Sequence, residues 1–229
     1  MRFDPEIWAQ VHDRREARHF AFWRGLELCA AVCAERVRPG ALWADVGCGT
    51  GHLTRSLAAL GARAVGLDHD FCMTRYARSR GAGGFAAAAA SSLALRDGSC
   101  AGLVAISLCG CLSDPIGVFA EAARVLAPGG TLCFSAMNRH SLLLAAGKPW
   151  SWRPGRRPAR YTAYDPAALV AALRQAAIVP EREILYGHFA GAGRFVLPSP
   201  AAARRFERTV LPGRRSAWAR QLLLVARRA

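Results

Sequence analysis

The sequence predicts an α/β domain built on a doubly wound, mostly parallel sheet, and three observations support this prediction. Between residues 41 and 136, short apolar runs alternate with amphipathic segments of helical spacing. Glycine-rich turns separate these segments, as at 47–51 and 128–130. The 229 residues are 52% hydrophobic and 21% charged, which supplies a sizeable core and excludes global disorder. Such alternation implies parallel β-α-β units with right-handed crossovers.

The N-terminal residues are expected to form a helical extension. Apolar side chains between residues 5 and 37 recur at spacings near 3.6, and arginines give a solvated face. Pro5 lies near the expected helix start, and Pro39-Gly40 ends the helix. We therefore divide the chain into an N-terminal helical cap, 1–39, and a domain over 40–229.

Five strands and three helices are expected between the cap and residue 137. The strands cover 41–46, 62–67, 85–90, 103–107 and 131–136, and the helices cover 52–60, 70–80 and 114–126. Asp114 is the expected N-cap of the third helix, with Pro115 at its first position. Asp70 suits the cap of the second helix better than Asp68 does.

Residues 138–163 interrupt this pattern, because their prolines and glycines exclude a long helix. We expect a basic, aromatic insertion there, lying over one end of the sheet. A helix over 165–177, capped by Asp165, follows it. A strand at 182–189, a basic segment at 204–215 and a closing strand at 221–226 complete the expected order.

The charge is large and unevenly distributed. The formal net charge is +15, and residues 138–229 hold 17 basic but only 4 acidic side chains. This asymmetry is typical of proteins with an acidic partner, such as nucleic acid, an anionic membrane surface or an anionic substrate. Arginine-rich, lysine-poor usage also fits a GC-rich coding composition, so both interpretations stay open.

Eight cysteines are present, but none forms a C-x2-C pair. We therefore expect no metal site and read the cysteines as small hydrophobic residues. The longest uncharged apolar stretch, 98–113, is shorter than the ~20 residues of a membrane span. The acidic N-terminal residues Asp4 and Glu6 do not suit a signal peptide, and we expect a cytoplasmic protein.

The most informative stretch is Asp45-Val46-Gly47-Cys48-Gly49-Thr50-Gly51, between an expected strand and an expected helix. Glycines allow a tight turn there and let a ligand approach main-chain N–H groups. Asp68 ends the next strand, 23 residues after Asp45. That separation is close to the ~20 residues at which an acid meets a ribose diol in dinucleotide-type folds. The pattern lacks the lysine of a phosphate-binding loop, and its third glycine comes too early for a nicotinamide fingerprint.

These residues resemble the class I S-adenosylmethionine-dependent methyltransferases, above all the ubiquinone and menaquinone biosynthesis group. The segment D-V-G-C-G-T-G at 45–51 is similar to the first motif of that family. Segments 66–68, 95–99 and 124–132 follow in the family's order. The resemblance implies a seven-stranded sheet with a reversed last hairpin. It also implies S-adenosylmethionine as cofactor and S-adenosylhomocysteine as product.

The resemblance further implies the roles of single residues. The loop glycines line the methionine part of the cofactor, Asp45 supports their turn, Asp68 binds the ribose hydroxyls and His69 flanks the adenine. The implied cofactor-binding set is Asp45, Gly47, Cys48, Gly49, Gly51, Asp68, His69, Ser92, Leu93 and Ser107. Two family features are absent: Ala89-Ala90 stands at the usual acidic position near adenine, and Gly110-Cys111 replaces a histidine pair.

Methyl transfer from a sulfonium requires alignment of the acceptor and exclusion of water, and a base only where the acceptor holds a proton of high pKa. His140, after the fifth expected strand, is our candidate base; His188 and Tyr164 are further candidates. The aromatic side chains expected to contact the acceptor are Trp150, Trp152, Tyr161 and Tyr164.

Three functions remain, and the first suits the chain best. The first is O-, N- or C-methylation of a small molecule that is anionic or aromatic. The second is RNA methylation, in which the basic C-terminal half would follow phosphates. The third is a non-catalytic cofactor-binding subunit that supports a partner. The sequence predicts no oligomeric state.

Overall fold

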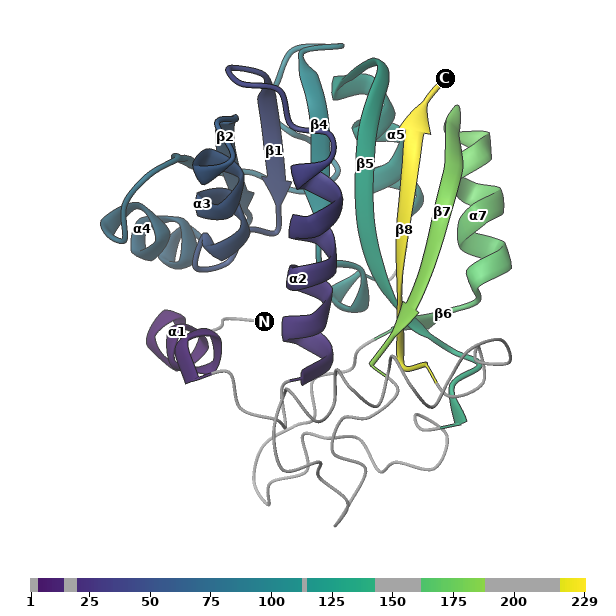
Figure 1. Cartoon of the computed structure of the whole chain (residues 1–229), viewed down its shortest axis with the longest axis horizontal. Helices are drawn as coiled ribbons and strands as arrows, with labels where there is room; N and C mark the ends of the chain where they lie inside the picture. Colours follow the sequence, from purple (N-terminus) through teal and green to yellow (C-terminus); the bar gives the residue numbers. More distant parts are fainter. Residues whose placement is uncertain (1–3, 15–19, 113–114, 143–161, 188–218) are drawn as a thin grey trace.

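A computed structural model describes residues 4–14, 20–112, 115–142, 162–187 and 219–229 (Figure 1). The helices are α1 (Pro5–Arg14), α2 (Phe20–Ala34), α3 (His52–Ala59), α4 (Phe71–Ser79), α5 (Ile116–Val125) and α7 (Pro166–Gln175), with a short 3-10 helix η2 (Cys109–Cys111). The strands are β1 (Leu42–Val46), β2 (Arg63–Asp68), β3 (Gly84–Ala87), β4 (Cys100–Ala105), β5 (Leu126–Asn138), β6 (Ala163–Tyr164), β7 (Ile178–Tyr186) and β8 (Gln221–Arg228).

The strands form one sheet in the order β3-β2-β1-β4-β5-β8-β7. Neighbours from β3 to β5 pair in parallel, whereas β8 runs antiparallel to both β5 and β7. The mostly parallel sheet with a reversed last hairpin is therefore confirmed. The two-residue strand β6, which pairs with the end of β5, adds an eighth strand to the seven expected.

Two layers of helices cover the two faces of the sheet (Figure 1). Alternate residues of the central strands point to opposite faces, so Val104 and Cys133 pack with α2 and α3. Their neighbours Leu103 and Phe134 pack with α5 and α7. Because both faces of β4 and β5 are covered, these strands read as continuous apolar runs, as parallel strands do.

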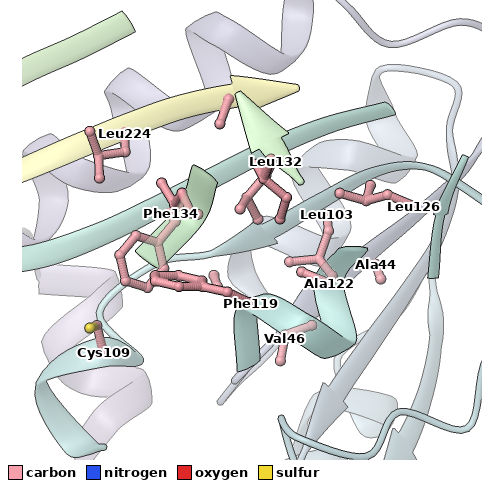
Figure 2. Packing of buried hydrophobic residues seen from close by; sticks show 14 of the residues in the cluster. Ala44, Val46, Leu103, Cys109, Phe119, Ala122, Leu126, Leu132, Phe134 and Leu224 are labelled. Atoms are coloured by element: carbon pink, nitrogen blue, oxygen red, sulfur yellow. The ribbon is translucent and has the colours of Figure 1, made fainter. Parts of the chain in front are cut away.

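The core beneath α5 shows this packing closely (Figure 2). Phe119 of α5 meets Phe134 of β5 edge to face, with ring centroids 4.9 Å apart. Both rings are fully buried, and Leu132 and Leu224 continue the same cluster along β5 and β8. This core holds the carboxyl ends of β4 and β5 side by side, where a ligand site of this fold opens.

Several expected boundaries need correction. The single N-terminal helix expected over 5–37 is two helices, α1 and α2, although the residues between them lie outside the described part. Strand β5 begins at Leu126, because Leu126 pairs with Cys100 before a register shift; the expected start was 131. Strand β7 begins at Ile178, four residues before the expected start, because Ile178 already pairs with Arg228.

The expected helix caps are confirmed at two positions and shifted at a third. The side chains of Asp70 and Asp165 accept hydrogen bonds from Cys72 and Ala167 at the starts of α4 and α7. Pro115 is the N-cap of α5 instead of its first residue. Asp114, which we expected there, lies outside the described residues.

Helix α2 packs directly on the sheet. Its Cys29, Val32 and Cys33 are buried against Trp43 and Val104. The division of the chain at residue 39 stays a prediction, and α2 contributes to the same core as the strands that follow it. Within the described ranges, no helix is long and apolar enough to cross a membrane.

Candidate functional site

The site begins where β1 turns into α3. Gly47, Gly49 and Gly51 all have positive φ, at 74°, 51° and 76°, a region that L side chains rarely adopt. Gly47 and Cys48 both donate their N–H groups to the Leu67 carbonyl, so the turn is tied to the end of β2. The glycine pattern thus forms a backbone turn that residues with side chains would strain.

The glycines of this turn have different surroundings. A Cβ at Gly51 would lie 2.7 Å from the Phe85 ring, so Gly51 allows α3 to approach β3. A Cβ at Gly49 would meet no described atom within 4 Å. Gly51 therefore serves packing, whereas Gly49 lines open space above the turn.

Asp68 binds the turn from β2. Its Oδ2 accepts a hydrogen bond from the Gly49 N–H at 2.9 Å, and its Oδ1 accepts one from the Asp70 N–H at 2.9 Å. The parallel register pairs Val46 with Leu67, which brings Asp68 level with the turn. The His69 ring is largely exposed, and its Nδ1 lies 3.4 Å from Asp68 Oδ1. Two carboxylate oxygens offer about four acceptor sites, so Asp68 retains capacity for further donors.

Asp45 lies beneath the turn and is fully enclosed. Thr54 Oγ1 on α3 donates to Asp45 Oδ2 at 2.7 Å, which links the end of β1 to the helix. Burial raises the pKa of Asp45 to about 6, against the opposing effect of the Thr54 hydrogen bond. This carboxyl group therefore supports the turn from inside the fold.

The segment after β3 holds Ser92 and Leu93. Ser92 is exposed, whereas the Leu93 side chain is buried in the core below α5. The Leu93 N–H donates to Glu121 Oε1 at 2.5 Å. Ser92 thus lies on the surface, while Leu93 anchors the loop to the core.

Arg124 holds this segment in place. Its guanidinium donates to the carbonyls of Leu93, at 3.0 Å, and Leu95, at 2.9 Å. It also pairs with Glu121 at 2.7 Å and with Asp97. Arg124 begins the family segment 124–132, but the sequence alone indicated no role for it. The planar guanidinium, with its several donors, is what allows one side chain to bind a whole loop.

A second group of residues surrounds the carboxyl ends of β4 and β5. Ser107 has a positive φ of 62°, and its N–H donates to Ser135 Oγ at 2.7 Å. The Tyr164 hydroxyl donates to the Leu112 carbonyl at 2.7 Å. The Thr162 N–H donates to the Gly110 carbonyl, so two hydrogen bonds tie residues 162–164 to residues 110–112.

His140 stands next to this group. Its ring Nε2 lies 3.1 Å from Asp165 Oδ2, and its backbone N–H donates to Asn138 Oδ1 at 3.0 Å. The hydrogen bond from the Ala167 N–H, with that from His140, lowers the pKa of Asp165. A histidine oriented by a carboxylate can accept a proton on its other ring nitrogen. The remaining candidates Trp150, Trp152, Tyr161 and His188 lie outside the described residues.

The structure thus places the predicted residues in two groups. Asp45, Cys48, the loop glycines, Asp68 and His69 lie at the ends of β1 and β2. His140 and Tyr164 lie at the ends of β5 and β6, and Ser107 lies between the groups at the end of β4. Burial and then the nearby Asp68 charge raise the pKa of Cys111, so η2 lies within electrostatic reach of the first group.

A family model described as a methyltransferase domain matches residues 44–134. A curated relative, the ubiquinone biosynthesis O-methyltransferase of Methylococcus capsulatus, is 36% identical over 101 residues. That alignment covers 42% of this chain and 43% of the relative. The chain therefore matches less than half the length of this relative.

Solved structures match over much more of the chain. One belongs to the complex between the Haloferax volcanii Trm112 methyltransferase activator and the putative methyltransferase, with a TM-score of 0.67 and 20% identity over 100% of this chain and 99% of that chain. Another is the magnesium protoporphyrin IX methyltransferase of Synechocystis PCC 6803 with bound SAH. Its TM-score is 0.65, at 17% identity over 96% of this chain and 87% of that chain. At these identities the similarity concerns the fold.

Proposed function

We propose that this protein transfers a methyl group from S-adenosylmethionine to a small-molecule acceptor, because residues 44–134 match a family model described as a methyltransferase domain. The product of the cofactor would be S-adenosylhomocysteine. The observation that carries the proposal is the glycine turn bound to Asp68. We further propose a cytoplasmic location, where its eight free cysteines would stay reduced.

The residues present suit this cofactor. Open space above Gly49 leaves room for a ligand against the backbone, and a side chain there would fill it. Asp68 keeps acceptor sites for a pair of hydroxyl groups after binding two N–H groups. His69, exposed beside Asp68, would flank the base, and Ser92 would contact it from the loop that Arg124 holds. When bound, the cofactor supplies an electrophilic methyl group on a sulfonium.

The protein would contribute alignment and a dry environment. The Gly47–Gly51 backbone would orient the amino-acid part of the cofactor from below. Ser107 and the η2 turn would separate the cofactor from the acceptor. Tyr164, fixed by its bond to Leu112, would contact the acceptor, and so would Trp150, Trp152 and Tyr161 if the insertion lies over the site.

We assign His140 the role of general base for acceptors with a hydroxyl proton. The Asp165 carboxylate, 3.1 Å from Nε2, would orient its ring. The relative named above is an O-methyltransferase, so phenolic hydroxyl groups are the first acceptors to test. An acceptor whose nucleophile carries no proton of high pKa would not need His140.

Binding and turnover test the proposal separately. Equilibrium dialysis with labelled S-adenosylmethionine should show saturable binding, and Asp68→Ala should weaken it by about 100-fold, because two charge-assisted hydrogen bonds are lost. Asp70→Asn is the matched control, since it changes a neighbouring carboxyl group but retains a cap acceptor. Equal loss in both variants, or no binding by the folded wild type, would overturn the cofactor assignment.

Incubation with a cell extract and labelled cofactor then identifies the acceptor class. Label in small molecules that resists ribonuclease supports the proposal. Label that ribonuclease removes would instead favour RNA as the acceptor. Cofactor binding without label in any acceptor would instead favour the non-catalytic, cofactor-binding subunit. For His140→Ala, a pH–rate profile identical to wild type would remove His140 as the base.

A further inference from the structure

Three cysteine thiols meet beneath α2, away from the glycine turn. Cys29 and Cys33 lie one turn apart on α2, and Cys133 lies in the middle of β5. All three are fully buried, and their sulfur atoms lie within 4.8 Å of one another. The Sγ atoms of Cys29 and Cys33 are 4.0 Å apart. Helical i, i+4 spacing puts the first two on one face, and the fold brings the third to that face.

The spacing of these sulfur atoms fits a shared ligand. Three sulfur atoms around a central ion, each about 2.3 Å from it, are about 4 Å apart when the arrangement is planar. The separation between the Cys29 and Cys33 sulfur atoms already has this value, and the other two separations are at most 4.8 Å, so only a small adjustment is needed to reach that geometry. A disulfide between any two of the thiols would require a much larger approach, to a bond of about 2 Å.

The surroundings decide which ion the thiols would suit. Val32, Trp43, Val104 and Val225 enclose the cluster in apolar side chains. Among the described residues, no further histidine, cysteine or carboxylate joins the group. Zinc takes four ligands in a tetrahedron, and this apolar site offers three. Soft thiolate ligands instead favour Cu(I).

We propose that Cys29, Cys33 and Cys133 form a three-sulfur site for a thiophilic monovalent ion, Cu(I). Binding forms three copper–sulfur bonds, and each thiol that ionises releases its proton to solvent.

The site has a physical connection to the glycine turn. Trp23, also on α2, packs edge to face on His52 with ring centroids 5.4 Å apart. His52 is the first residue of α3 and follows Gly51 directly. In Figure 1, α2 runs along the sheet in front of β4, between β1 and β5. Fixing α2 to β5 through an ion would therefore stiffen the support of the turn, although the metal site does not depend on the proposed methyl transfer.

Anaerobic titration with Cu(I) against a chromophoric Cu(I) chelator tests the proposal. The exposed thiols Cys72 and Cys111 are first replaced in a Cys72→Ser/Cys111→Ser background. We expect one Cu(I) per chain in this background and a higher melting temperature. Cys33→Ala in the same background should weaken binding by at least about 100-fold, because one of three ligands is lost. Cys100→Ala, which removes a buried thiol outside the cluster, is the matched control and should leave binding unchanged.

X-ray absorption at the copper edge of the copper-loaded background protein requires no core variant. We expect three sulfur neighbours at about 2.3 Å. Two sulfur neighbours, a nitrogen neighbour, or equal losses in Cys33→Ala and Cys100→Ala would overturn the proposal. Absence of Cu(I) binding by the folded protein would do so as well, while dialysis with labelled S-adenosylmethionine on the same sample would test the proposed cofactor binding independently.

Discussion

The two halves of the candidate site are held together in different ways. The half at the ends of β1 and β2 is a backbone structure, in which Asp68 binds the N–H groups of Gly49 and Asp70. The half at the ends of β5 and β6 consists of side chains, in which His140 meets Asp165 and Tyr164 meets the Leu112 carbonyl. Almost every partner in the first half lies within about one β-α-β unit. Partners in the second half come from 25 to 52 residues apart.

This difference separates two kinds of specificity. A site made from backbone recognises a ligand that does not vary, and its glycines have little freedom to change. The ligand preference of a site made from side chains can change with single substitutions, because each contact depends on one side chain and its partner. We therefore expect changes in the first half to affect the cofactor and the stability of the fold. Changes in the second half should affect the acceptor alone.

The largest expected effect distinguishes two glycines of the first half. Gly51→Ala adds a Cβ at 2.7 Å from Phe85 in a positive-φ position, and should lower the free energy of unfolding by about 3 kcal/mol. Gly49→Ala has the same backbone strain but meets no described atom, and should cost about 1 kcal/mol. Chemical denaturation measures both. Equal losses would mean that close packing on Phe85 does not explain Gly51.

Asp45 should make stability depend on pH in the opposite sense to a salt-bridged carboxylate. Burial raises its folded pKa from 3.8 to about 6, so the folded state holds the proton more tightly than the unfolded state. The stabilisation is fully present below about pH 4 and is lost as pH rises through 6, a change on the order of 3 kcal/mol. Urea denaturation of wild type and Asp45→Asn between pH 4 and 7 measures the difference. If the free energy of unfolding changes with pH by the same amount in wild type and in Asp45→Asn, Asp45 does not titrate as described.

Arg124 ties the loop that carries Ser92 to α5, and its removal should weaken cofactor binding. Arg124→Met removes the bonds to the Leu93 and Leu95 carbonyls and leaves Glu121 without its cation. We expect about tenfold weaker cofactor binding, because the loop that holds Ser92 is released. Dialysis on Arg124→Lys, which keeps the charge but not the planar donors, should show an intermediate loss. Full affinity in the Met variant would restrict Arg124 to a structural role.

Tyr164 offers the smallest and most selective test. Tyr164→Phe keeps the ring and removes one hydrogen bond to the Leu112 carbonyl. This loss should lower the free energy of unfolding by about 1 kcal/mol. The KM for the acceptor should rise several-fold, while the dissociation constant of the cofactor stays at the wild-type value. A change in cofactor affinity of the same size would mean that the two halves are not independent.

Much of the first half could be predicted from the sequence alone. The glycine turn, Asp68 and the parallel strands follow from short-range signals: apolar runs, glycines where φ is positive, and a capping aspartate. The loop-holding role of Arg124 could not be predicted, since its partners Leu93 and Leu95 are about 30 residues away. The extension of β5 back to Leu126 also needed the pairing with Cys100, because Pro-Gly-Gly reads as a turn by itself.

The sequence by itself determined the order of the main elements, the glycine turn and the acidic residues at the ends of β1 and β2, because local backbone preferences and hydrophobic periodicity decide these features. Only the tertiary structure brought His140 to Asp165 and gathered Cys29, Cys33 and Cys133 into one cluster. The physical reason is that these contacts depend on the register between strands and on how a helix packs across the sheet. No spacing within one segment encodes either.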